Sequence, residues 1–412
     1  MSMRGYGIMI AAFFTVSIAY GVRYGYGMLL PGMLDSLKIS KTEAGLISSA
    51  YFATYTIFSP VLGLLSDRFG SRLLLTLFPA LLATGALLMG HVATVGEAAL
   101  VFSLAGLGHA ACWAPVVSLV QKWVDDRHRG TALAVATMGS GLGIAAWSLW
   151  LPVVVEQSSY RDGWLHMGLF GFGVAALNFL LIRDPHDPLR EPSAAEDSPP
   201  GKPQEQPCSY LQLLGDRRLW LVGASYACIG FTVLVPFTFL GVYATKELQL
   251  PYGTATRFFT VMAVAGIAGK LILGTLSDRI GRVTAMMLCG LCLGFGCLGF
   301  IHLGGLTGKY LSAGVVGLGF GGVWPVYAAA APDYFPKAMA GSVIGLWTVF
   351  MGIGSILSPI ICGWTIDTFA TFSRAFYLGC LLSMAAVLLL LPLRSEAAAL
   401  RQKYGKVASR LV

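Results

Sequence analysis

Residues 63–70 read GLLSDRFG, and residues 274–281 read GTLSDRIG. The two strings begin 211 positions apart, which is about half of the 412-residue chain. Each string follows one long apolar run and precedes another. A charged connection that recurs at matching places in two halves indicates an internally duplicated membrane protein.

The same offset relates residues outside this motif. Trp113 corresponds to Trp324, and the pair Gly141 and Gly143 corresponds to Gly352 and Gly354. The halves are therefore predicted to be parallel repeats, which bind their substrates near the membrane midplane between the halves. The glycines of both clusters have two interpretations, a sliding surface between the halves or tight helix packing. They are Gly139, Gly141, Gly143, Gly345, Gly352 and Gly354.

The composition places most of the chain in lipid. Its mean hydropathy is +0.71, with 56% hydrophobic and 12% charged residues, whereas soluble domains carry about 25% charged residues. Twelve apolar stretches are long enough, or nearly so, to cross about 30 Å of hydrocarbon as helices. The predicted spans are 7–30, 44–65, 73–89, 98–120, 131–155, 164–181, 219–243, 258–276, 283–303, 310–331, 341–361 and 375–393. We therefore predict an all-α membrane protein.

The basic residues predict the orientation. Most of the 28 Lys and Arg residues fall on the cytoplasmic side when both termini are placed there, as the positive-inside rule requires. This placement accounts for the net charge of +8 without a nucleic-acid partner. The chain's one asparagine, Asn178, is followed by Phe-Leu and forms no glycosylation sequon, which fits a bacterial inner membrane.

The domain boundaries follow from one break in the apolar pattern. Residues 183–209 are rich in proline and charge, cannot bury a core, and are predicted to form a cytoplasmic linker. The linker separates a six-helix half at 1–182 from another at 210–393. Residues 394–412 are predicted to be a basic cytoplasmic tail, helical at the membrane surface.

The repeated motif resembles the loop pattern G-x-L-x-D-R-x-G-R-[KR] of the major facilitator superfamily. The first copy has Ser71 where the pattern has its first arginine, and the second is followed by Val283. The resemblance spans essentially the whole chain and implies twelve helices in two six-helix pseudo-repeat halves. It implies that the motif latches the halves through a neighbouring helix end; the alternative is that it sets topology alone. The motif residues are Gly63, Asp67, Arg68, Gly70, Arg72, Gly274, Asp278, Arg279, Gly281 and Arg282.

Two cations lie inside predicted spans. Arg23 is in the first span and Lys270 in the eighth, and no acidic residue lies within a helical turn of either. A charge at the centre of a membrane helix costs about 2.5–3.5 kcal/mol on insertion scales, so it needs a partner or a function. Arg23 either snorkels to the outer surface or lines a cavity. Lys270 is either structural or part of a positively charged anion site.

A narrower resemblance favours the anion site. The spacing of Lys270, Gly274 and Asp278 is similar to that in monocarboxylate porters and oxalate/formate antiporters, which have a carboxylate-binding cation, usually Arg, at this position. The first span resembles that of organophosphate antiporters, whose phosphate-binding Arg lies near the place of Arg23. Their seventh-helix Arg has no counterpart in the uncharged stretch 219–243, which argues against phosphate esters. Gly266 occupies the position of an acidic proton-relay residue in eukaryotic monocarboxylate porters.

Aromatic residues are expected around the cavity, although about half of them are expected to pack between helices instead. His109, the one midspan histidine, either exchanges protons or is a hydrogen-bonded structural residue. Cys289 and Cys292 form a CxxC that we interpret as apolar packing. Tyr26 is one of these aromatic residues. The candidate substrate-binding residues are Lys270, Arg23, Tyr20, Tyr24, Cys112, Trp113, Trp324, Tyr327 and Trp347, with His109 for proton coupling.

These patterns predict a monomeric secondary transporter of small organic anions, monocarboxylates foremost, working by proton symport or anion exchange. The alternatives are a pump for amphipathic drugs or metabolites, in which Lys270 is structural, and a non-transporting membrane sensor. The sequence contains no nucleophile–base pair, phosphate loop or metal cluster. We therefore expect no enzymatic activity and no cofactor.

Overall fold

The computed structural model describes residues 3–124, 126–183, 213–336 and 339–404, and it contains only helices within these ranges. We call α1 to α7 the first half and α9 to α14 the second half. The helices of the first half are α1 (Met3–Leu37), α2 (Lys41–Phe69), α3 (Ser71–Met89), α4 (Val95–Ala110), α5 (Ala114–Trp123), α6 (Asp126–Gln157) and α7 (Tyr160–Leu181). Those of the second half are α9 (Arg217–Val242), the π-helical turn η1 (Tyr243–Glu247), α10 (Tyr252–Ile280), α11 (Arg282–His302), α12 (Gly305–Tyr334), α13 (Ala340–Phe369) and α14 (Ser373–Tyr404).

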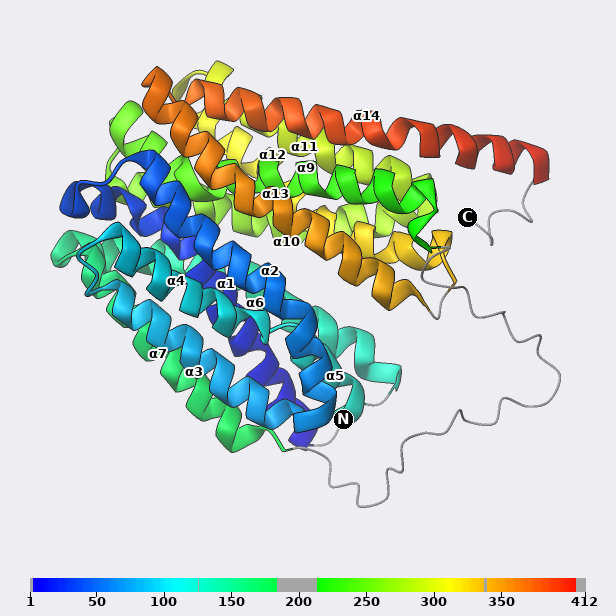
Figure 1. Cartoon of the computed structure of the whole chain (residues 1–412), viewed down its shortest axis with the longest axis horizontal. Helices are drawn as coiled ribbons and strands as arrows, with labels where there is room; N and C mark the ends of the chain where they lie inside the picture. The colour runs from blue at the N-terminus through cyan, green and yellow to red at the C-terminus, as the bar shows by residue number, and fades with distance from the viewer. Residues whose placement is uncertain (1–2, 125, 184–212, 337–338, 405–412) are drawn as a thin grey trace.

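The two halves lie side by side as elongated bundles (Figure 1). Twelve helical segments are long and apolar enough to cross a membrane, which confirms the predicted fold and number of spans. Both described chain ends, Met3 and Tyr404, lie at the same end of the molecule, which we call the terminal end. We call the opposite end the distal end. The predicted linker 183–209, apart from Arg183, lies outside the described residues, and the domain boundaries stay predictions.

The backbone conformation explains why the repeated motif ends in glycine. Gly70 is the one residue between α2 and α3, and Gly281 is the one residue between α10 and α11. Their φ angles are 83° and 92°, and residues with a Cβ atom rarely adopt such positive values. Each glycine therefore allows two membrane helices to follow one another through a single-residue turn.

The fourth span is interrupted. We predicted one helix over 98–120, but α4 ends at Ala110 and α5 begins at Ala114. Pro115 lacks a backbone N–H and restricts the backbone angles of the residue before it. It is therefore suited to the first turn of α5 and could not continue α4. The prediction of a continuous helix is wrong at this point. Non-helical backbone at membrane depth is tolerated where it is buried in protein or lines a cavity.

The glycines of α6 lie at two kinds of close contact, and a sliding surface between the halves stays a prediction. A Cβ atom at Gly143 would clash with the backbone of Ser17 on α1 of the same half. A Cβ atom at Gly141 would instead meet Ile267 on α10 of the other half. Successive glycines on α6 therefore serve packing within the first half and close contact between the halves.

Polar contacts join the halves from the distal end to the middle of the molecule. At the distal end the Asp35 carboxylate lies 2.6 Å from the Lys246 ammonium, and the Thr42 N–H and hydroxyl donate to Asp367 at 2.8 and 2.7 Å. Deeper in the molecule, the Ser49 hydroxyl donates to the carbonyl of Ile356 at 2.6 Å.

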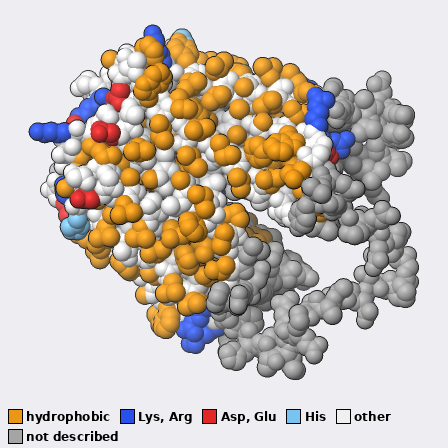
Figure 2. Space-filling view, viewed as in Figure 1, with side chains coloured by type: hydrophobic (Ala, Val, Ile, Leu, Met, Phe, Trp, Pro, Cys, Tyr) orange, Lys and Arg blue, Asp and Glu red, His pale blue; other side chains and the backbone are white. Residues whose placement is uncertain are grey.

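Towards the terminal end the described contacts between the halves reach Lys270 on α10. Figure 2 shows a notch between the two halves at this end. Within the described residues, the halves therefore contact one another at the distal end and as far as Lys270, and a notch separates them at the terminal end.

Candidate functional site

Arg23 lies deep inside the molecule, in the middle of α1. Its side chain is 4% exposed and therefore does not snorkel to the surface. Aromatic rings of α1 and α2 surround the guanidinium, whose central carbon lies within about 6 Å of four ring centroids, a range typical of cation–π contacts. The distances are 4.5 Å to Phe52, 4.9 Å to Tyr55, 5.4 Å to Tyr24 and 5.8 Å to Tyr20.

The guanidinium of Arg23 keeps donors without a protein partner. Nε and Nη1 are both buried, and neither makes a hydrogen bond to another described residue. A buried donor left unpaired costs about 1–3 kcal/mol, and more when it is charged. The aromatic rings offset part of this cost, but they supply no negative charge. An anion at these donors would supply both the missing acceptor and the missing negative charge.

His109 and Tyr51 lie beside this guanidinium. The hydroxyl of Tyr51 on α2 and Nδ1 of His109, the next-to-last residue of α4, share a hydrogen bond. The centroid of the imidazole ring also lies 5.0 Å from that of Tyr55 and 5.3 Å from that of Tyr20, two of the rings that surround Arg23. The only midspan histidine of the sequence is therefore both hydrogen-bonded and part of the arginine site.

The second half supplies an opposing aromatic wall. Tyr226 of α9 and Tyr327 of α12 stack with ring centroids 4.2 Å apart and planes 13° apart. The hydroxyls of Tyr327 and Ser225 share a hydrogen bond of 2.8 Å. Trp324 meets Tyr226 edge-on at 6.0 Å, and its buried Nε1 has no hydrogen-bond partner among the described residues. Tyr226, Tyr327 and Trp324 therefore form one aromatic cluster of the second half.

Tyr24 connects the two walls. Its ring lies 4.1 Å from that of Phe237 on α9 and 5.8 Å from that of Phe320 on α12. The Tyr24 hydroxyl is buried and has no described hydrogen-bond partner. The region between the halves therefore combines one cation, several donors without a protein acceptor and apolar ring faces. Such a mixture is typical of a small-molecule site.

Lys270 lies at a different place on the boundary between the halves. Its ammonium on α10 donates to the carbonyl of Thr137 at 2.9 Å and to the hydroxyl of Ser140 at 2.6 Å, both on α6. Lys270 therefore bridges the halves in this structure through neutral acceptors. Its role in substrate binding stays a prediction.

The remaining candidates do not all join the arginine site. Trp347 is 1% exposed and donates from Nε1 to the carbonyl of Leu219 at 3.0 Å, so it packs inside the second half. Tyr26 donates to the carbonyl of Ala44 at 2.7 Å inside the first half. Cys112 and Trp113 lie in the break between α4 and α5, where Cys112 is buried and Trp113 is 38% exposed.

Two arginines of the repeated motif make contacts inside their own halves. Arg282 lies 2.6 Å from Asp278 and 3.3 Å from Asp333 at the end of α12, and it also contacts Ser277. In the first copy, Arg72 donates to the carbonyl of Phe179 at 3.0 Å.

Gly63 lies against Ala114, Gly274 has open space beside it, and Arg279 is exposed. The side chains of Asp67 and Arg68 lie outside the described part of the structure. The latch between the halves therefore stays a prediction.

Sequence reasoning missed four aromatic residues of the site, namely Tyr51, Phe52, Tyr55 and Tyr226. The spacing of Tyr51 and Tyr55 places them on one face of a helix and was a usable signal. Tyr226 is a single tyrosine in an apolar span, where nothing in the sequence separates a cavity residue from a packed one.

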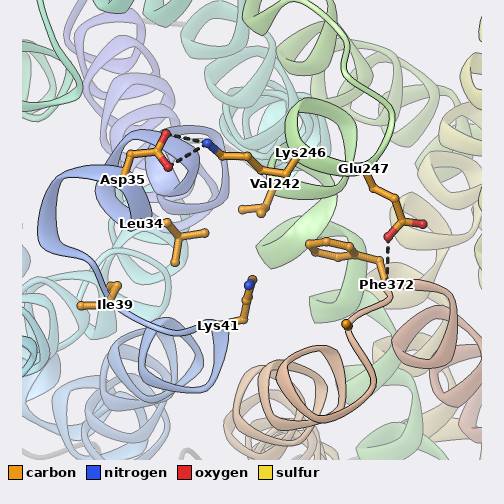
Figure 3. Close-up of a pocket in the computed structure, with 9 residues that line it drawn as sticks. Leu34, Asp35, Ile39, Lys41, Val242, Lys246, Glu247 and Phe372 are labelled. Carbon is orange, nitrogen blue, oxygen red and sulfur yellow. Dashed lines mark hydrogen bonds and ion pairs between the residues drawn. The ribbon is translucent and has the colours of Figure 1, made fainter.

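The distal end contains a cavity of about 430 Å³ between the halves. Figure 3 shows Asp35 and Lys246 pointing toward one another at its edge, while Glu247 accepts a hydrogen bond from the backbone of Phe372. This cavity carries charges of both signs, and its ion pair joins α1 to η1. Its position suits a gate rather than a site for one kind of anion.

Comparison with known proteins agrees with this architecture. The family model described as "Major Facilitator Superfamily" matches residues 12–316 and 310–410. The hexuronate transporter of Bacillus subtilis is 24% identical over 394 residues, with 90% of each chain covered. The probable galactarate/D-glucarate transporter GarP of Escherichia coli K12 is 25% identical, with 93% of each chain covered. Monocarboxylate transporter 11 of Homo sapiens is 25% identical, covering 91% of this chain and 79% of its own.

Two solved structures share the fold. A mutant form of the nucleoside transporter NupG superposes with a TM-score of 0.76 at 13% identity, covering 93% of this chain and 99% of its own. A bacterial homologue of the human lysosomal transporter Spinster, described as inward-facing and occupied, has a TM-score of 0.72 at 13% identity, with 96% of each chain covered. With its duplicated motif, its twelve spans and a family match across nearly its whole length, the chain belongs to the Major Facilitator Superfamily.

Proposed function

We propose that this protein transports small organic anions across the membrane by alternating access, and that Arg23 binds the substrate carboxylate. The observation that carries the proposal is the buried guanidinium of Arg23, whose Nε and Nη1 have no protein acceptor among the described residues. A planar guanidinium presents paired donors that match the two oxygens of a carboxylate. An oxygen atom of the substrate carboxylate would supply an acceptor that these donors lack in the protein.

The aromatic wall of the second half receives the body of the substrate. The faces of Tyr226 and Tyr327 accept apolar or C–H surface, while Trp324 Nε1 and the Tyr24 hydroxyl offer donors to oxygen atoms. A substrate held by Arg23 and by this wall contacts both halves at once. Its binding therefore acts on the equilibrium between the open and closed arrangements of the halves.

The names of similar proteins support this class of substrate. Those named above are transporters of a hexuronate, of galactarate or D-glucarate, and of monocarboxylates. Each name refers to an organic acid, although the acids differ in size and in their number of hydroxyl groups. We infer that a carboxylate is the common requirement, and that monocarboxylates are the first substrates to test.

The positive-inside distribution of Lys and Arg supports an orientation with the terminal end in the cytoplasm. In that orientation the structure is inward-facing, because its halves are joined at the distal end. The proposed site lies between the two halves of a single chain and needs no second copy, so we propose a monomer. We assign it to the bacterial inner membrane.

Coupling to protons is assigned to His109. It shares a hydrogen bond with Tyr51 beside Arg23, so a proton on its ring would place a second positive charge near the guanidinium. Such a pair is tolerated best when an anion lies between the two charges. Binding of the anion and protonation of His109 therefore favour each other, as proton symport requires. Anion exchange is the alternative in which His109 stays neutral.

Lys270 is proposed to supply a second positive charge along the substrate path. In this structure its ammonium holds Thr137 and Ser140 across the boundary between the halves. Movement of α6 against α10 would exchange these neutral acceptors for a passing anion. The substrate and the acceptors on α6 would thus compete for the ammonium of Lys270.

Uptake into liposomes tests the function. Purified protein is reconstituted, and entry of radiolabelled lactate, glucuronate and glucarate is measured with and without a pH gradient. We expect saturable uptake of at least one acid and little uptake by Arg23→Gln at equal protein content. Equal uptake by wild type and Arg23→Gln would reject the proposed site.

A further inference from the structure

A lipid-facing groove lies on the second half, away from the arginine site. The short connection Ala370–Phe372 joins α13 to α14, and the two helices diverge from it toward the terminal end (Figure 1). Between them and α11 lies a groove of about 680 Å³. It is lined by Leu298, Ile361, Trp364, Thr365, Arg374, Tyr377, Leu378, Cys380, Leu381 and Met384.

The groove has one charged end and an apolar interior. Arg374 is exposed in the first turn of α14, and its guanidinium lies 3.5 Å from the centroid of the Phe369 ring. Beside it, the Tyr377 hydroxyl and Nε2 of His302 share a hydrogen bond of 2.9 Å. Ten residues further along α14, Met384 lies about 15 Å deeper at 1.5 Å per residue. That depth equals about half of the 30 Å hydrocarbon core, or one leaflet.

The surroundings identify the occupant as a lipid. Trp364 is 56% exposed and Tyr377 is 43% exposed, as expected for residues that lie near the membrane interface. No described acidic residue pairs with Arg374, whose one described interaction is with Phe369. A cation at the polar end of an apolar groove one leaflet deep matches a phosphate joined to an acyl chain. A second copy of this chain would have to supply an acidic residue to the same place.

We propose that this groove binds an anionic phospholipid of the surrounding bilayer, with an acyl chain between α13 and α14 and the phosphate at Arg374. The α14 N-terminus, one residue before Arg374, adds favourable polarity for an anion. The lipid fills the space that the diverging helices leave and connects α13, which contacts the first half, to α14. The assignment does not depend on which substrate the protein carries.

Lipid retention by the purified full-length protein tests this site. Delipidated protein is incubated with phosphatidylglycerol or phosphatidylcholine, and bound lipids are counted by native mass spectrometry. We expect one phosphatidylglycerol to be held about five- to tenfold more tightly than phosphatidylcholine, as one cation near a membrane surface provides. Arg374→Gln should remove this preference, and Arg374→Lys should retain most of it.

Arg257→Gln is the matched control, because Arg257 is also exposed near the distal end of its helix but lies outside the groove. It should leave the preference unchanged. The proposal is overturned if Arg374→Gln keeps the wild-type preference, or if Arg257→Gln loses as much. Displacement of the lipid by glycerol phosphate, which has no acyl chain, would assign a free-anion site and also overturn it.

Discussion

Replacing Arg23 with glutamine should remove binding of organic acids without harming the fold. In the structure, Nε and Nη1 of Arg23 have no protein acceptor among the described residues, so the substitution breaks no described hydrogen bond at either atom. Each charge-assisted hydrogen bond to a carboxylate contributes about 1.5–3 kcal/mol. Loss of about that amount raises the dissociation constant about 10- to 150-fold, because 1.4 kcal/mol corresponds to a factor of about ten.

Thermal unfolding of the purified protein separates binding from folding. A ligand present at about 100 times its dissociation constant stabilises the folded state by about 2.7 kcal/mol. Wild-type protein should therefore unfold at a higher temperature in the presence of a transported acid. Arg23→Gln should unfold without ligand at about the wild-type temperature, since loss of cation–π contacts and relief of a buried unpaired charge oppose each other. It should show almost no shift with the acid.

Tyr26→Phe provides a matched control on the same helix. Tyr26 hydrogen-bonds to the carbonyl of Ala44 and lies in the packed first half. Its loss should lower stability by about 1 kcal/mol and leave the ligand-induced shift intact. The reasoning is refuted if Arg23→Gln retains the full shift with the acid, or if it unfolds without ligand far below Tyr26→Phe.

Three further substitutions test other parts of the account. Lys270→Gln should greatly reduce acid uptake in liposomes while Lys270→Arg retains part of it, and wild-type uptake by Lys270→Gln would mark the lysine as structural. His109→Gln should make uptake insensitive to a pH gradient while exchange of labelled for unlabelled acid continues; an unchanged response to the gradient would exclude His109 from coupling. Asp35→Asn removes the ion pair with Lys246 at the distal end, worth about 0.2–1 kcal/mol at this exposure. It should raise the reactivity of a cysteine introduced at Tyr24 toward a reagent added from the distal side, and unchanged reactivity would show that this pair does not hold the gate.

The duplicated motif and the hydropathy were enough to predict the fold. GLLSDRFG and GTLSDRIG indicated the two halves, and the structure gives their last glycines a clear reason in the φ angles of Gly70 and Gly281. The interruption at Ala111–Trp113 was not predicted, because the hydropathy of 98–120 is continuous and Pro115 was not weighed as the start of a new helix. Apolar composition predicts which segments enter the lipid. It predicts much less well where a helix is interrupted within the membrane.

The site was predicted less completely than the fold. Arg23 and Lys270 were both selected as candidates, since a cation in a span is conspicuous, but the sequence favoured Lys270 through its spacing to Asp278. The structure instead shows Lys270 engaged by Thr137 and Ser140 and shows Arg23 with donors that lack described protein acceptors. This difference depends on which side chains lie across the boundary between the halves. A single sequence does not show which side chains of the two halves contact one another.

The most direct test of the central claim compares acids with their neutral amides. Wild-type protein in liposomes is offered radiolabelled lactate and lactamide, then glucuronate and glucuronamide, at equal concentrations. The account predicts saturable uptake of at least one acid and none of its amide, because Arg23 recognises the carboxylate. Equal transport of an acid and its amide would contradict the claim that a carboxylate bound by Arg23 is the feature this transporter recognises.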